Sequence, residues 1–429
     1  MNNKIRTKII FLFSLITILS GQNHQSILKI HSNPKGSNFW WLEKNNYGKS
    51  FIETEIEYQW KLNNKNTIYQ ITFSNGYKNY TTDYPVRYVG TIRYNVRHWL
   101  FLGESFIKHN FSDNTFLRVG KYYRDFSQYL NDDLSSGSML ISTNAQAMPK
   151  IGLVSSYSIK KNKNISFNFG ISHGIFDKEG YYDEAPILHE KFLYININKN
   201  NYTVGIGLVH EAMWAGSPPE LGNLPDTFKD FLKVFISADG PYTPPHANAL
   251  GSHMGIWDFY YKKNNGNQVL KLYYQHFFED TSSFRFRNEI DGLWGVELKN
   301  YIPDTNILFE YLDTSHSRLD PPYQDDYYYW NYQYRVGWQY KNKIIGNPFV
   351  DTDHFYNREF IKLLHLGIKS EFSSNYYKIK ASRRINIEDD ILYKIILGKK
   401  IKNNLDLNIF IANNSDNHGL GMGISYIFE

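Results

Sequence analysis

The sequence predicts an all-β protein, a closed antiparallel transmembrane β-barrel of the outer-membrane type. Three observations predict this fold class. The chain opens with a secretion-type segment, most later residues alternate between apolar and polar, and 9 Trp, 35 Tyr and 29 Phe suit strands that cross a membrane interface. The 429 residues have a mean hydropathy of −0.50, and no apolar run reaches the roughly 18 residues that a membrane-spanning helix needs.

Residues 1–21 are predicted to be a signal peptide. Basic residues at positions 4, 6 and 8 precede an apolar stretch over residues 9–19, and small residues follow at Ser20 and Gly21. This segment carries three of the 47 basic residues, which leaves the mature chain nearly neutral against 42 acidic residues. The charge therefore gives no reason to expect a nucleic-acid partner.

Residues 22–50 are predicted to form a short periplasmic N-terminal segment, and residues 51–429 to form the barrel. Alternation is clear over residues 51–60, 88–97 and 165–172, and the last ribbon ends on Phe428, near the terminus. A soluble antiparallel sheet also alternates, but many such ribbons in a secreted chain favour a membrane barrel. The sheet must then close, because hydrocarbon leaves no partner for the backbone groups of an open edge.

About 18 strands are predicted, with a range of 16–18, since a strand and its connection use roughly 22 residues of the mature chain. The wall side chains of such a barrel do not fill its lumen. Two long stretches that break the alternation, residues 123–150 and 211–250, are therefore predicted to be infolded or extracellular loops. The second is rigid, because it holds six of the 14 prolines.

Three ordered motifs occur in or near these loops. Residues 210–222 read HEAMWAGSPPELG, residues 134–139 read LSSGSM and lead into NAQAMP, and residues 337–348 read GWQYKNKIIGNP. Together they resemble the capsule assembly Wzi family. The chain departs from the family pattern at Ser252, where the family tends to have an acid, and at Tyr332, which replaces a common His.

The resemblance implies an outer-membrane β-barrel of a Gram-negative-type bacterium that binds capsular or related surface polysaccharide and helps assemble or retain it, without catalysing a reaction. The implied partners are extracellular polysaccharide, outer-membrane lipid and lipopolysaccharide, and the barrel-assembly machinery during insertion. Relatives carry a periplasmic helical bundle, for which the segment before the first ribbon is short. The runner-up function is a porin-like channel for small hydrophilic solutes.

The candidate polysaccharide-binding residues gather around residues 325–340, a run dense in Tyr and Trp with interleaved amide and guanidinium groups. Sugar rings stack on flat aromatic side chains, and sugar hydroxyls bond to planar polar groups. An aromatic girdle at the membrane interface is the alternative explanation, and Trp214 is equally a packing anchor. The candidates are Trp214, Tyr329, Trp330, Asn331, Tyr332, Tyr334, Arg335 and Trp338, with Lys341 and Lys343 at the family's basic positions.

No catalytic, metal-binding or cofactor-binding residue is predicted. The chain has no Cys, which excludes disulfides, thiolate catalysis and Cys-based zinc sites. No G-x-S-x-G nucleophile motif occurs. Neither the pair His210 and Glu211 nor the pair His246 and His253 has the spacing of a helical zinc motif.

Overall fold

The computed structural model describes residues 24–32, 44–49, 54–77, 82–86, 90–94, 98–159, 162–240, 249–279, 281–316, 328–350, 360–386, 391–414 and 417–428. The predicted signal peptide over residues 1–21 lies outside these ranges. Within the described ranges, no helix has both the length and the apolar character that a membrane crossing requires.

The described part of the chain is mainly β-structure, with helices α3 (Phe228–Phe235) and α4 (Thr281–Phe284). The strands are β1 (His24–Ser32), β2 (Thr54–Asn64), β3 (Thr67–Tyr77), β4 (Thr82–Val86), β5 (Gly90–Tyr94), β6 (His98–Leu102), β7 (Ser105–Ser112), β8 (Thr115–Tyr122), β9 (Met148–Ile159), β10 (Asn162–Ile175), β11 (Ile187–Lys199), β12 (Tyr202–Trp214), β13 (Ser252–Asn265), β14 (Gln268–Phe278), β15 (Gly292–Lys299), β16 (Thr305–Asp313), β17 (Gln339–Tyr340), β18 (Lys343–Ile344), β19 (Lys362–Phe372), β20 (Asn375–Arg384), β21 (Ile391–Lys402), β22 (Leu405–Asn414) and β23 (Asn417–Phe428).

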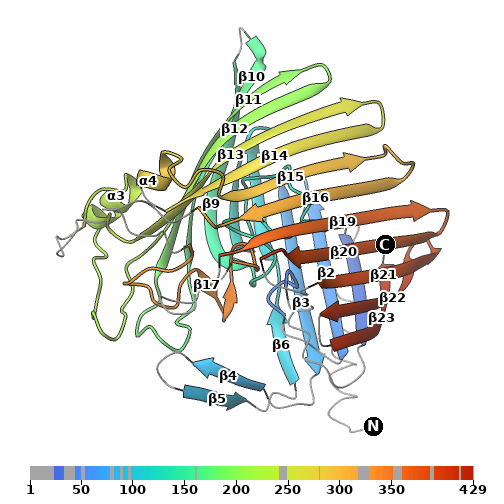
Figure 1. Ribbon diagram of the computed structural model, residues 1–429, viewed down its shortest axis with the longest axis horizontal. Coiled ribbons are helices and arrows are strands. Elements are labelled where there is room, and N and C mark those ends of the chain that lie inside the picture. Colours follow the sequence, from blue (N-terminus) through green and yellow to red (C-terminus); the bar gives the residue numbers. More distant parts are fainter. Residues whose placement is uncertain are drawn as a thin grey trace.

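A closed antiparallel barrel dominates the fold (Figure 1). Successive strands pair around the sheet, and β1 closes the ring by pairing with β23 as well as with β2. β6 and β7 both pair with β3 and are two halves of one wall strand, so the 19 strand segments of this sheet make a wall of 18 strands. The predicted fold class and strand number are confirmed.

The wall is apolar outside and polar inside. Along β11, Ile195 is 45% exposed whereas its neighbour Asn196 is 4% exposed, and the same alternation continues through Leu193 and Ile197. Successive side chains of a strand point to opposite faces, so the exposed face is the outer one. Charged side chains such as Glu297 and Glu310 are buried in the lumen. This reversal of the soluble pattern is the mark of a barrel surrounded by lipid.

The connections divide sharply between the two ends of the barrel. β2–β3, β11–β12 and β19–β20 each join through two residues at one end. The described parts of the connections over residues 123–147, 215–251 and 314–361 lie at the other end. Since outer-membrane barrels have short periplasmic turns and long extracellular loops, the long-loop end faces the cell exterior.

The barrel begins earlier than the sequence analysis predicted. Strand β1 lies within the 22–50 segment that was assigned to the periplasm, yet it pairs with β2 and β23 over its length. Its Lys29 points into the lumen and bonds to Glu57 at 2.8 Å. The prediction missed β1 because few apolar residues mark its outer face.

Residues 44–49 also contradict the periplasmic assignment. The Tyr47 N–H donates to the Thr143 carbonyl at 2.7 Å, and the Asn45 side chain donates to the Ser136 carbonyl at 2.6 Å. These partners belong to a connection of the long-loop end. Residues 44–49 therefore pack on the extracellular side of the lumen.

The ribbon predicted over residues 88–97 is not a wall strand along its described part. Residues 90–94 form β5, which pairs only with β4 in a separate two-stranded hairpin. Figure 1 shows this hairpin away from the barrel wall. Residues 87–89 and 95–97 lie outside the described ranges.

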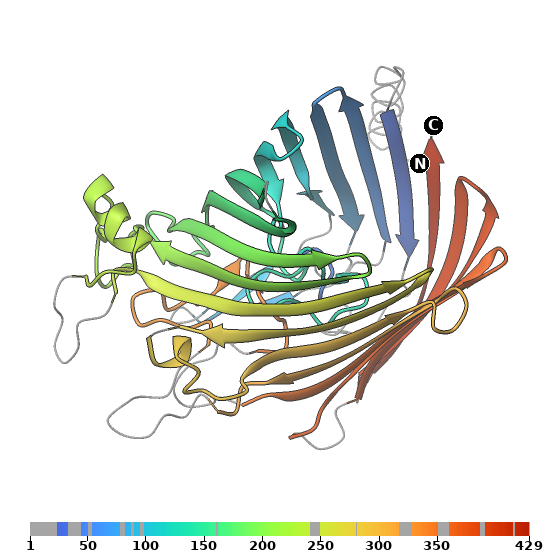
Figure 2. The ribbon, with the colours of Figure 1, turned by 90° about the horizontal axis from the view of Figure 1, so that it is seen from above.

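Two connections of the long-loop end fold into the lumen, and we call residues 123–147 and 328–350 the plug. Leu134, Met139 and Leu140 of the first connection have no exposed surface, and Trp338 of the second packs with them in one apolar cluster. Residues 123–150 were predicted to be an infolded or an extracellular loop, and up to β9 they are infolded. The predicted loop over residues 211–250 instead begins as part of β12 and then carries α3, which lies outside the ring of strands (Figure 2).

Candidate functional site

Buried carboxylates of the wall hold the first plug segment in place. Glu310 accepts hydrogen bonds from the Ser135 hydroxyl and the Ser136 N–H, both at 2.6 Å, and from the Tyr273 hydroxyl. Asp258 likewise accepts from the hydroxyls of Ser127 at 2.5 Å and of Tyr194 at 2.6 Å. Hydrogen bonds to charged acceptors are among the stronger ones, so these acids fix the plug to the wall.

The second plug segment packs on the first. The Trp338 indole N–H donates to the Leu140 carbonyl at 2.8 Å, and the Tyr329 hydroxyl donates to the Met139 carbonyl. The Asn347 amide donates to the Gly137 carbonyl at 2.6 Å. The two segments thus form one packed body inside the lumen, in which the LSSGSM motif contacts the GNP motif.

Four predicted ligand-stacking rings lie inside packed structure. Tyr329, Tyr334 and Trp338 are buried in the plug, where the Tyr334 hydroxyl reaches the Ala215 carbonyl at 3.1 Å. Trp214 is buried on the outer wall, with its ring 5.8 Å from that of Phe231. A sugar cannot stack on a covered ring face, so we assign these four residues to packing.

The other six predicted residues lie toward the long-loop end and keep accessible surface, and we call this set the outer ledge. Tyr332 is 41% exposed. The Arg335 guanidinium pairs with Glu220 at 3.4 Å, and Glu220 also accepts from the Tyr181 hydroxyl at 2.6 Å. The outer ledge comprises Trp330, Asn331, Tyr332, Arg335, Lys341 and Lys343.

One loop carboxylate joins the two parts of the outer ledge. Lys341 and Asn342 have φ values of 52° and 59°, as a two-residue hairpin turn between β17 and β18 requires. Glu179 accepts the N–H groups of both residues, at 2.7 Å from Asn342. Glu179 belongs to the same loop as Tyr181, so residues 179–181 link the Lys341 hairpin, through Tyr181 and Glu220, to Arg335. No sequence motif marked Glu179, because its partners lie about 160 residues away.

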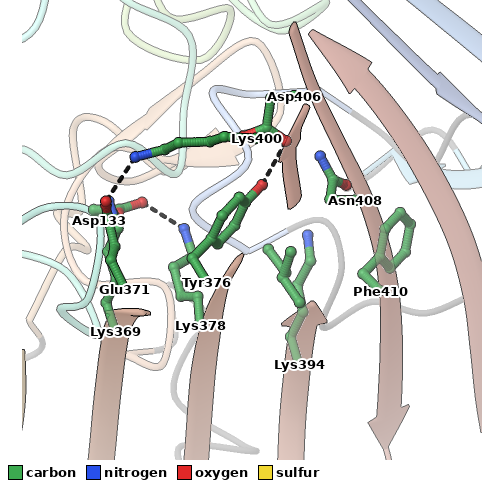
Figure 3. A pocket seen from close by; sticks show the side chains of 11 residues that line it. Asp133, Lys369, Glu371, Tyr376, Lys378, Lys394, Lys400, Asp406, Asn408 and Phe410 are labelled. Atoms are coloured by element: carbon green, nitrogen blue, oxygen red, sulfur yellow. Dashed lines mark hydrogen bonds and ion pairs between the residues drawn. The ribbon is translucent and has the colours of Figure 1, made fainter. Parts of the chain in front are cut away.

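A pocket of about 330 Å³ remains in the lumen on the periplasmic side of the plug (Figure 3). Its walls come from β19–β22 and from Asp133 of the plug. Asp133 pairs with Lys378, and Lys400 pairs with Glu371 at 2.6 Å. The Lys394 ammonium lies 4.9 Å from the Phe410 ring centre. Four lysines face three acids here, so the pocket is weakly cationic and can accept an anionic group.

The comparisons with known proteins add the family. The family model described as capsule assembly protein Wzi matches residues 100–365, more than half of the chain. This chain belongs to the capsule assembly Wzi family. Its matched region begins in β6 and ends in β19. It contains the plug and the outer ledge.

The structural comparisons of this Wzi-family chain return porins. Two engineered variants of Rhodopseudomonas blastica porin match with TM-scores of 0.39 and 0.38, at 9% and 8% identity, over 95% of this chain and 99% of theirs. Another porin structure matches with a TM-score of 0.35 at 10% identity, over the same shares. No curated protein matches significantly.

One side-chain group of this Wzi-family protein has the spacing of a cation site that the sequence analysis did not identify. Ligand atoms of Asp291, Asp313 and His316 lie within 4.8 Å of one another. Both carboxylates already accept protein donors: Tyr328 reaches Asp291 at 2.7 Å, and Tyr311 reaches Asp313 at 2.6 Å. The group therefore clamps two extracellular loops through hydrogen bonds.

The two residue pairs considered as metal ligands in the sequence, His210 with Glu211 and His246 with His253, do not form a described metal site. His210 lies on the outer wall, where its Nε2 is 2.9 Å from Nδ1 of His253. Glu211 follows it on β12 and therefore points into the lumen. His210 and Glu211 cannot share one ion, and His246 lies outside the described residues.

The contact between Glu179 and the Lys341 hairpin is expected to depend on pH. Burial raises the pKa of Glu179 from 4.5 to about 7. A carboxyl whose pKa is higher folded than unfolded contributes most below pH 4.5, and that contribution is lost as the pH rises through about 7. The Lys341 and Asn342 amides should therefore lose protection from hydrogen exchange between pH 5 and about 7.5. This loss should remain after the rates are corrected for base-catalysed intrinsic exchange.

The control for this prediction is Glu179→Gln, which keeps a carbonyl acceptor but does not titrate. Its amide protection, corrected for intrinsic exchange, should stay flat over the same pH range. An equally steep dependence in this variant would show that another group controls the hairpin.

Proposed function

We propose that this Wzi-family outer-membrane barrel binds a capsular-type polysaccharide on its outer ledge and so helps to hold the polymer at the cell surface. The observation that carries the proposal is the division of the lumen loops into two roles. Their buried side packs inside the barrel. Their outward side presents the Tyr332 ring, the Asn331 amide and three cationic side chains, all within the region that the family model matches. A closed barrel with a polar outward surface suits holding a polymer better than passing solutes.

The chemistry of the outer ledge suits sugars. Tyr332 offers a ring face to the apolar C–H side of a pyranose, and Asn331 offers an amide for hydroxyl groups. Arg335, Lys341 and Lys343 favour a polymer with carboxylate or phosphate substituents. The role is binding without bond cleavage. Lipopolysaccharide and membrane lipid around the wall, and the assembly machinery during insertion, are the further partners that we propose.

A porin-like channel is the second candidate function. The 18-strand wall favours it, because bare barrels of this size enclose a water-filled passage. The plug argues against it, since two extracellular segments fill the lumen with buried side chains.

The proposal is tested with purified protein and polysaccharide from the source cell's surface. The triple variant Tyr332→Ala, Lys341→Ala, Lys343→Ala is expected to bind about tenfold more weakly, a loss of about 1.4 kcal/mol spread over three partly exposed contacts. Isothermal calorimetry or surface plasmon resonance measures the change.

A matched control removes the same residue types from the periplasmic end. Tyr301, Lys263 and Lys402 are exposed near the short turns. The variant Tyr301→Ala, Lys263→Ala, Lys402→Ala should bind like the unmodified protein. Equal losses in both triple variants, or no loss in the first, would refute binding at the outer ledge.

A further inference from the structure

Helix α3 docks on the outside of the barrel wall. Its Phe231 ring lies 5.3 Å from that of His173 on β10 and 5.4 Å from that of His189 on β11. The Phe231 ring also lies 5.8 Å from the Trp214 ring on β12. Val234 of the helix has no exposed surface. The helix therefore lies against three neighbouring strands on the face that carries the apolar residues of the wall.

Both ends of α3 are fixed. Thr227 caps the N-terminus in a capping box with Asp230, whose carboxylate accepts the Thr227 N–H at 3.1 Å. At the other end, the Lys191 ammonium donates to the Phe235 carbonyl. An eight-residue helix is not stable by itself, so capping and docking together hold it on the wall.

The sequence of α3 gives the helix three faces. At 100° per residue, Phe231 and Val234 share the face that meets the wall. Lys229, Asp230 and Lys233 share a polar face on the far side. Between them lies an open apolar face, formed by Phe228 and Leu232, 75% and 48% exposed, with the C-cap residue Ile236.

The open apolar face continues the lipid-facing band of the wall. Leu193 and Ile195 of β11 and Ile175 of β10 are exposed apolar residues on the same outer side. Helix α3 sits where this band reaches the extracellular end, which is where hydrocarbon gives way to head groups. A sugar-binding role does not suit this face, because its exposed side chains are hydrocarbon only.

We propose that α3 is an interfacial helix bound to the outer leaflet of the membrane. Its open apolar face enters the acyl-chain layer, while Lys229 and Lys233 meet the anionic head groups. A helix with separate wall, lipid and water faces suits a position at this boundary. The proposal concerns lipid and does not depend on polysaccharide binding.

The test uses site-directed nitroxide labels, for which the absence of native cysteine gives a clean background. Single variants Phe228→Cys and Leu232→Cys place labels on the open apolar face. Lys229→Cys and Lys233→Cys are matched controls one position away on the polar face. The mature protein is reconstituted in vesicles that contain anionic lipid, and collisions with oxygen and with an aqueous nickel chelate are compared by electron paramagnetic resonance.

Labels at 228 and 232 are expected to collide severalfold more often with oxygen than with the nickel chelate, and labels at 229 and 233 to show the reverse. Heat-modifiable migration in gels checks that each variant is folded. Equal nickel accessibility at all four positions would overturn the proposal. In vesicles of purely zwitterionic lipid the labels at 228 and 232 should lie shallower, and an unchanged depth would overturn the assigned role of the two lysines.

Discussion

Replacing residues 128–141 with a Gly/Ser segment of equal length is expected to turn a non-conducting barrel into one that passes steady ionic current. The replacement removes Leu134 and Met139 from the apolar cluster and also removes Ser135 from its bond to Glu310. The wall strands keep their pairing and residues 328–350 stay in the lumen, so a water-filled passage narrower than the full 18-strand lumen should open beside them. Planar-bilayer recording measures the change, with the unmodified protein close to the baseline.

A replacement of residues 221–223 by Gly/Ser is the control, because these residues are exposed in the extracellular loop that follows β12. It should leave the barrel silent. Large steady currents from the unmodified protein would contradict the closed lumen and favour the porin-like function.

Substituting Glu310 with Ala is expected to destabilise the folded barrel by about 3 kcal/mol, since it removes the shared acceptor of three buried donors. Glu310 is buried, and its loss leaves the Ser136 N–H and the Tyr273 hydroxyl without that partner. Urea unfolding in detergent, followed by heat-modifiable migration, measures the effect. The same variant should also show flickering currents, because the plug loses an anchor.

Glu371→Ala is the matched control for Glu310→Ala. Glu371 is also a lumen carboxylate, but it is solvated and pairs with Lys400 at 2.6 Å. Exposed ion pairs contribute at most about 1 kcal/mol, so this variant should be far milder. Equal losses in both variants would mean that Glu310 does not anchor the plug.

The fold could be predicted largely from one sequence because lipid and water enforce a period of two along every wall strand. Ile195 and Asn196 show this rule in its simplest form, one outside and one inside. The rule fails where a strand has little apolar outer face. Strand β1 is such a case, and its role in closing the barrel follows only from its pairing with β23.

The candidate site was harder to predict, because exposure in the plug depends on contacts between distant segments. Tyr332 and Trp338 stand six positions apart in one aromatic run, yet only Tyr332 keeps a large exposed surface. Trp338 is buried in the lumen cluster and donates to the carbonyl of Leu140, almost 200 residues away in the chain. Composition identifies such a run as rich in rings, but it cannot separate rings that pack from rings that face solvent.

The anchors of the plug escaped prediction for a related reason. Asp258 and Glu310 fit the ordinary alternation of their strands, so the sequence gives no sign that they bond to Ser127 and Ser135. Helix α3 lies in residues 211–250, which the sequence predicted only as a loop, since its three faces become meaningful once the wall beside it is known.

The fate of the polysaccharide after loss of the gene tests the central claim most directly. Cells that lack the gene are complemented with the unmodified protein, with the outer-ledge triple variant or with the periplasmic-end control, and cell-bound and released polymer are measured separately. We predict that total polymer stays the same, while cells without the protein or with the outer-ledge variant release most of it to the medium. A cell-bound fraction that is the same in all four strains would contradict the account.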